Sequence, residues 1–211
     1  MTASIQITNS ATVSDEGVTP DSDQQLLLVC VHEVGHTIVE MVLNQTTAGC
    51  EVYRTESGEW LGKAHATGGN RPTDRSGWVN GAASFFGGFA AVELAVREGR
   101  LPPCPDGERI ERYFGYAGSV PWMPSTDADL QTARTEGRYV SDEAAVEWCT
   151  WCGSGNPLLR DETVRTEALE RARSILADYL SLIMELAAEL AEHKALQAER
   201  IAVVLVEHGV L

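Results

Sequence analysis

The sequence predicts a mainly α-helical domain that carries one small β hairpin. Three long stretches, residues 22–43, 74–99 and 161–193, have the apolar patterns and end signals typical of helices. Only residues 51–67 combine strand-forming residues with a turn, at Ser57-Gly58. Because 211 residues is a common size for one domain, we expect residues 22–211 to fold as a unit behind a flexible N-terminal segment, residues 1–21.

The first half of the chain supplies one helix, the hairpin and a second helix. Ser22 and Gln25 form a capping-box pattern, so the first helix should begin there and end near residue 43. The hairpin strands are expected over Glu51–Thr55 and Trp60–Thr67. The helix over 74–99 contains glycines at positions 77, 81, 87 and 88, and each costs about 1 kcal/mol relative to alanine. We therefore expect another element to pack very close to this helix.

The second half is expected to be helical after a connection over residues 100–125. That connection includes a short helix near 107–114. One further helix is expected to begin at about Asp127 or Ala128, and two others to cover roughly 141–152 and 197–207. From 161 to 193 a broad apolar stripe is opposed by a polar face that is not basic. This pattern favours packing against the domain, or against a second copy of the chain, over binding to a membrane.

The composition excludes several classes of partner. With a net charge of −15 the surface repels nucleic-acid backbones and anionic lipid. Five cysteines without framework spacing favour a reducing compartment, and the N-terminus lacks the features of a secretory signal, so we expect a cytoplasmic protein. Residues 26–43 approach the length of a membrane span, but three ionisable groups at their centre favour a buried helix. Cys149 and Cys152 form C-x-x-C, which we interpret as core packing in preference to a redox or metal pair.

The most informative motif is H-E-x-x-H, formed by His32, Glu33 and His36 within the apolar stretch 26–43. Residues i and i+4 share one face of a helix, so both imidazoles can bind one ion. Glu33 lies beside them, where its carboxylate can accept a proton from water that zinc has made more acidic. Burying these groups would be costly without a partner, which favours a zinc site over two ordinary buried histidines.

The residues around this motif resemble the FtsH-type zinc metallopeptidase family, the protease domain of AAA proteases. “HEVGHTIVE” is similar to that family's “HEAGHAIV” helix. Three later segments resemble the family in the same order, namely “GGFAAVELA” at 87–95, “STDADLQTAR” at 125–134 and the helical tail at 171–201. The resemblance covers about residues 22–208 and implies an FtsH-like helical peptidase fold, a zinc cofactor and a polypeptide substrate.

The resemblance also implies a third zinc ligand far from the motif. In the family this ligand is the aspartate of “NDI” at the start of a later helix, and the matching residue here is Asp129. Two alternatives stay open. Many zinc peptidases place a glutamate such as Glu93 on a downstream helix, and Asp127 is a third candidate, although it can instead cap the helix that carries Asp129. If Glu93 is not a ligand, it can still accept an N–H from a zinc-bound imidazole.

The chain departs from the family in ways that change the expected activity. No G-x-x-x-x-G-K-[ST] motif occurs, no membrane span precedes the peptidase segment, and the arginine of the family's “GGR” is Phe89. ATP-driven unfolding, hexamer formation and membrane location are therefore not implied. We expect cleavage of flexible segments or of one dedicated partner, with a homo-oligomer or a separate ATPase subunit left open.

Two further features bear on substrate binding. Zinc peptidases often steady the oxyanion with a downstream Tyr or His, so His65, Tyr53, Tyr113 and Tyr116 are candidates, although ordinary packing or surface roles are favoured for each. The strand over Trp60–Thr67 either receives an extended substrate at its edge or merely covers the zinc helix.

These observations predict a zinc-dependent endopeptidase that is ATP-independent in itself. His32, His36 and Asp129 are the predicted ligands, and Glu33 is the predicted general base. The alternative is a non-catalytic metal-binding interaction or scaffold module derived from a peptidase, and a regulator that cleaves one partner lies between the two. Retention of Glu33 favours an enzyme, since a structural metal site has no use for a base.

Overall fold

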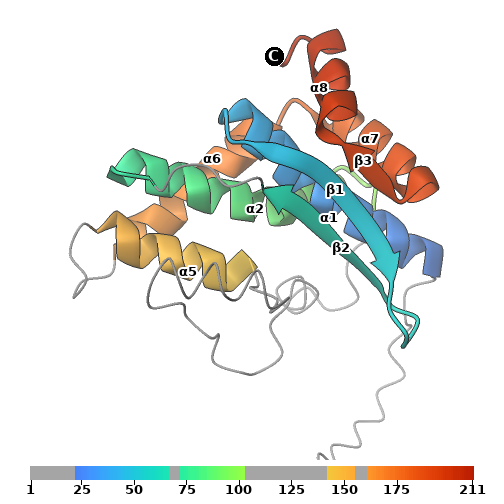
Figure 1. Ribbon diagram of the computed structural model, residues 1–211, viewed down its shortest axis with the longest axis horizontal. Coiled ribbons are helices and arrows are strands. Elements are labelled where there is room, and N and C mark those ends of the chain that lie inside the picture. The colour runs from blue at the N-terminus through green and yellow to red at the C-terminus, as the bar shows by residue number, and fades with distance from the viewer. Residues whose placement is uncertain (1–21, 67–71, 103–141, 155–160) are drawn as a thin grey trace, which may run out of the picture.

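The computed structural model describes residues 22–66, 72–102, 142–154 and 161–211, and these form a mainly helical fold, as the sequence predicts (Figure 1). The flexible segment expected over residues 1–21 and the helices expected near 107–114 and from Asp127 onward lie outside the described residues.

Two long helices, α1 (Ser22–Val42) and α2 (Arg75–Arg97), form the centre of the molecule. They cross at Gly35 of α1 and Gly87 of α2. The backbones are so close there that a Cβ atom on Gly87 would lie 2.6 Å from the carbonyl oxygen of Gly35. The close packing expected from the glycines of α2 is thus confirmed at this crossing. α2 ends as predicted, with Gly99 in the left-handed region at a φ of 68°.

The sheet has three strands, one more than the predicted hairpin. β1 (Thr47–Arg54) pairs antiparallel with β2 (Trp60–Ala66) and with β3 (Ala195–Gln197), in the order β2-β1-β3. The predicted hairpin is confirmed, although β1 begins four residues before the expected Glu51. The prediction of a single hairpin was incomplete because three residues, as in β3, are too few for strand periodicity to be recognised. β2 lies at one edge of this sheet.

Four helices complete the described fold: α5 (Asp142–Gly153), α6 (Glu162–Leu176), α7 (Leu180–His193) and α8 (Ala198–Glu207). The helices predicted over 141–152 and 197–207 are confirmed. The continuous helix predicted over 161–193 was wrong, because the chain turns between Leu176 and Leu180 so that α6 packs on α2 and α7 packs on α1. No glycine or proline marks this turn, since tertiary packing produces it.

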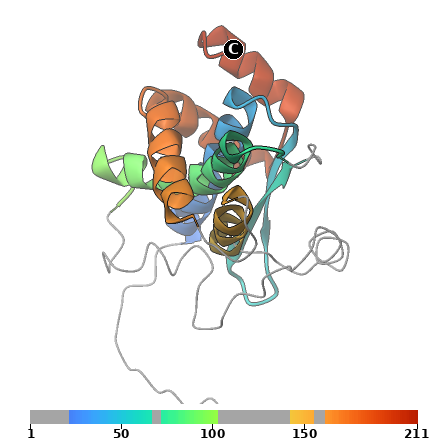
Figure 2. The same cartoon turned by 90° about the vertical axis from the view of Figure 1, so that its left-hand side faces the viewer.

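The core is built around α1 and α2. In the turned view of Figure 2 the sheet lies on the right of the molecule and α6 on the left, with α1 and α2 between them. Both central helices are long and apolar enough to cross a membrane by length and composition alone. In this fold, 61% of the apolar window of α1 and 67% of that of α2 are buried against other elements, as expected for core helices.

Candidate metal centre

The middle of α1 carries three buried ionisable residues. His32, Glu33 and His36 are 6%, 6% and 5% exposed. They belong to the same helix, and its apolar residues pack against α2, α7 and the sheet. The expected helix and the burial of its motif are therefore confirmed.

A carboxylate from α5 reaches the two imidazoles. The Nε2 atoms of His32 and His36 lie 2.9 Å apart. Oδ2 of Asp142, the first residue of α5, lies 3.1 Å from the former nitrogen and 3.2 Å from the latter. Two nitrogen donors and one oxygen donor thus converge on one point, although 110 residues separate His32 from Asp142.

The backbone of α2 orients the His36 ring. Nδ1 of His36 lies 2.7 Å from the carbonyl oxygen of Ser84, and a carbonyl oxygen can only accept, so Nδ1 carries the proton and donates it. When Nε2 loses its proton, its lone pair is therefore directed toward His32 and Asp142. An N–H from a ligating histidine to a backbone carbonyl is the usual support of a metal-bound imidazole.

The donor set fits a zinc ion in both chemistry and spacing. Zinc binds imidazole nitrogen and carboxylate oxygen at about 2.0–2.2 Å, which places the ligand atoms of a tetrahedron about 3.3–3.6 Å apart. The three distances of 2.9, 3.1 and 3.2 Å approach that spacing. Three protein ligands leave a fourth position for water or substrate, as catalytic zinc sites require.

The charges of these three residues are interdependent. Burial lowers the pKa of His32, and the charge on His36 lowers it further. For His36 the effect of burial is outweighed by the Asp142 carboxylate, which raises the pKa to about 10. Burial likewise opposes ionisation of Asp142, but the charge on His36 and hydrogen bonds from both rings hold its pKa well below the usual range. Because His36 holds a proton in the metal-free cluster, metal binding has to displace it.

Glu33 lies on the side of α1 that faces β2. Its carboxylate lies against Gly62, where a Cβ atom would come 2.5 Å from Oε1, and it accepts a hydrogen bond from the backbone of Ala64. Burial raises the pKa of Glu33 to about 8, while the charge on His36 lowers it. A divalent cation held by the neighbouring donors would lower this pKa further, because it favours the charged carboxylate.

Among the predicted third ligands, the structure tests one. Glu93 pairs with Arg173 of α6, with N–O distances of 2.7 and 2.6 Å, and it does not belong to the group of metal-binding side chains found among the described residues, so neither of its alternative roles is supported. Asp129 and Asp127 lie outside the described residues, and Asp129 stays a prediction.

Asp142 was not considered from the sequence, although a signal existed. It is the first residue of the helix predicted over about 141–152, and the resemblance places the acidic ligand at the start of a later helix.

The oxyanion candidates on the hairpin face away from Glu33. Since Gly62 and Ala64 of β2 point toward α1, strand alternation places His65 on the outer face. There its Nε2 lies 3.2 Å from Oε1 of Glu51, and Tyr53 of β1 is 45% exposed. Neither side chain is placed to reach the cluster, and Tyr113 and Tyr116 lie outside the described part of the chain.

The C-x-x-C pair lies on α5, two to three turns from Asp142. Cys149 is buried in the core and packs near Gly81 of α2, while Cys152 is half-buried. Cys149 is a free thiol. Within the described residues neither belongs to a group of three metal-binding side chains, which supports the predicted packing role.

Comparisons with known proteins do not identify a family. No protein-family model matches the chain, and no curated protein matches it. The resemblance to FtsH-type peptidases therefore stays a prediction from the motifs, and the geometry of the site is the basis for the function proposed next.

Proposed function

We propose that this protein is a zinc-dependent endopeptidase. The observation that carries the proposal is the convergence of His32, His36 and Asp142 within 3.2 Å of one another, beside the buried carboxyl of Glu33. A structural zinc site usually has four protein ligands and no adjacent base. Three donors with an adjacent carboxylate favour hydrolysis over a purely structural role.

Each residue has a distinct role in this proposal. His32, His36 and an acidic oxygen hold the ion, which makes water more acidic and polarises a carbonyl group when it is bound. Glu33 accepts a proton from the attacking water and passes it to the leaving amine. Its burial suits this role, because a general base works best when its pKa lies near the working pH. The geometry favours Asp142 as the acidic ligand, whereas the resemblance implies Asp129.

The edge strand β2 supports a polypeptide as substrate. Gly62 and Ala64 form its inner row and contact Glu33, and β1 is the only strand paired with it among the described residues. An extended polypeptide that paired with the other edge of β2 would run past Glu33. This position is compatible with both predicted roles of the strand, because it covers α1 and also offers an edge to substrate.

The metal content of purified variants tests the ligand set. We expect about one zinc per wild-type chain and severe loss for His32→Ala and His36→Ala, since each removes one of three ligands. Comparing Asp142→Ala with Asp129→Ala identifies the acidic ligand, and Glu93→Ala is a control that should retain the ion because Glu93 pairs with Arg173. Full zinc retention without His32 or His36 would refute the proposed site.

An activity assay separates the enzyme from the scaffold alternative. Casein and a mixture of flexible peptides are incubated with the wild type, with and without a chelator, and with Glu33→Gln. We expect cleavage that requires both the metal and Glu33, with at least about a 100-fold loss in the variant. Zinc binding without cleavage of any unfolded substrate would favour a metal-binding scaffold or a regulator that cleaves one partner.

We expect a cytoplasmic protein, which either acts alone or receives substrate from a separate ATPase.

A further inference from the structure

The backbone of α2 comes very close to the two imidazoles at Gly88. A Cβ atom at this position would lie 2.6 Å from Nε2 of His36 and closer still to ring atoms of His32, whereas real Cβ atoms essentially never come within 3.0 Å of such neighbours. The amide nitrogen of Gly88 already lies 3.4 Å from Nδ1 of His36. The two rings thus occupy the space that a side chain at position 88 would need.

Backbone conformation does not explain this glycine. Gly88 lies in the interior of α2, and its φ is not positive, so alanine would suit the backbone and favour the helix. The other interior glycines of α2 differ in their surroundings. A Cβ atom on Gly87 would meet the backbone of Gly35, while one on Gly81 would meet only Sγ of Cys149, at an ordinary 3.6 Å.

We infer that Gly88 is a positioning residue for the metal centre, because the missing side chain lets both imidazoles direct Nε2 toward one point. The rings have little room to retreat. His36 is tied to α2 by its hydrogen bond to the carbonyl oxygen of Ser84, one turn before Gly88, and both rings contact Asp142. Alanine at position 88 would therefore move the ligands and leave the rest of α2 intact. The test by zinc affinity rests on the proposed zinc site. The test by stability depends only on the packing of the two rings against Gly88.

Zinc affinity tests the first consequence. Competition with a chromophoric chelator, and the visible spectrum of the Co²⁺-substituted protein, are measured for Gly88→Ala and the wild type. We expect affinity to fall about 10- to 100-fold, as when groups that orient metal ligands are removed, together with a changed Co²⁺ spectrum. Gly81→Ala and Gly62→Ala are the matched controls. The first leaves the site untouched and the second crowds Glu33 but no ligand, so both should bind zinc like the wild type.

Thermal stability in the presence of a chelator tests the cause directly. Gly88→Ala is introduced into the wild type and into a His32→Ala/His36→Ala background, where the new methyl group has space. We expect the melting temperature to fall by about 4 °C or more in the first case and not to fall in the second. If the single variant does not fold, recovery of folding in the second background gives the same answer.

Three outcomes would overturn the inference: wild-type zinc affinity for Gly88→Ala, equal losses of melting temperature in the two backgrounds, or failure to fold in both. A wild-type protein that binds no zinc would instead refute the proposed function. In that case the stability comparison still decides whether Gly88 positions the rings.

Discussion

At the scale of single residues, burial and close packing decide what Glu33 can do. The carboxyl is 6% exposed and lies against β2, so its position depends on a neighbouring strand as well as on α1. Gly62 leaves the space that the carboxylate fills, and the backbone of Ala64 donates a hydrogen bond to it. A displacement of the reacting group by about 1 Å can reduce the rate about 100-fold.

Gly62→Ala should therefore slow hydrolysis without removing the metal. A methyl group at this position would force the Glu33 carboxylate aside, so we expect kcat to fall about 10- to 100-fold, with zinc content unchanged and KM little affected. Steady-state kinetics on a peptide substrate provide the measurement. Lys63→Ala on the outer face of the same strand is the control, and a wild-type kcat in Gly62→Ala would contradict the role of this contact.

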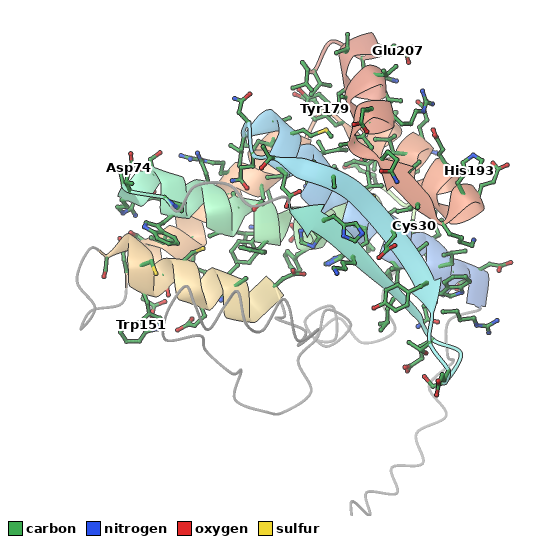
Figure 3. The ribbon with its side chains drawn as sticks, in the orientation of Figure 1. Cys30, Asp74, Trp151, Tyr179, His193 and Glu207 are labelled. Atoms are coloured by element: carbon green, nitrogen blue, oxygen red, sulfur yellow. The ribbon has the colours of Figure 1, made fainter. Side chains whose placement is uncertain are left out.

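Three of the cysteines should resist alkylation in the folded protein. Burial raises the pKa of Cys30, Cys50 and Cys149 to about 12, and the thiolate is the reactive form. Cys30 lies on α1 behind the sheet (Figure 3). Mass spectrometry after brief treatment with iodoacetamide at pH 8 should find these three unmodified and, among the cysteines of the described residues, the half-buried Cys152 modified first. Rapid native modification of Cys149 would show that α5 is less firmly packed than described.

At the scale of secondary-structure elements, a cap and surface ion pairs fix the beginning of α2, the helix that carries Gly88. Asp74 precedes the helix with extended backbone angles, and its Oδ1 accepts a 2.7 Å hydrogen bond from the amide of Gly77 (Figure 3). The next residue, Arg75, bridges to Asp161 and Glu167 and so ties the beginning of α2 to α6. The start of this helix is thus set by a cap and by ion pairs at the surface.

Asp74→Ala should destabilise the fold without altering the metal site. Loss of an N-cap side chain costs about 1 kcal/mol, which corresponds to about 2–4 °C in the melting temperature of a protein of this size. Thermal denaturation followed by circular dichroism provides the measurement. In Asp74→Asn the side-chain oxygen can still accept a hydrogen bond from the Gly77 amide, so this variant is expected to keep most of the stability. Equal losses in the two variants would exclude capping as the cause.

At the scale of the whole molecule, the candidate site depends on elements that are distant in the chain. α1 provides the two histidines, α5 provides Asp142, α2 orients the rings and β2 positions Glu33. The site can form only when these four elements have packed together, so an ion bound there favours the folded state over the unfolded chain. Zinc binding and global stability should therefore be coupled.

Zinc should raise the melting temperature in a concentration-dependent manner. At a free concentration about 100 times the dissociation constant, ligand linkage contributes about 2.7 kcal/mol, or about 5–10 °C for a chain of this length. Differential scanning fluorimetry of chelator-treated protein with added zinc provides the measurement. His36→Ala should show no such increase, and an equal increase in that variant would indicate binding elsewhere.

The elements were predictable from sequence wherever a local pattern specifies them. The capped apolar stretch of α1, the Ser57-Gly58 turn of the hairpin and the glycine after α2 all act within a few residues. The turn between α6 and α7 and the three-residue strand β3 were missed. Each is produced by contacts with segments far away in the chain, and neither contains a residue that breaks local structure.

By itself, the sequence determined the part of the candidate site that lies on one helix turn, since the spacing of His32 and His36 places two nitrogens on one face wherever that helix packs. Only the tertiary structure decided which described carboxylate completes the cluster. In this fold Asp142 contacts the imidazoles, whereas Glu93 forms an ion pair with Arg173. The physical reason is that helical spacing is set by backbone geometry, whereas a contact across 110 residues depends on how whole helices pack.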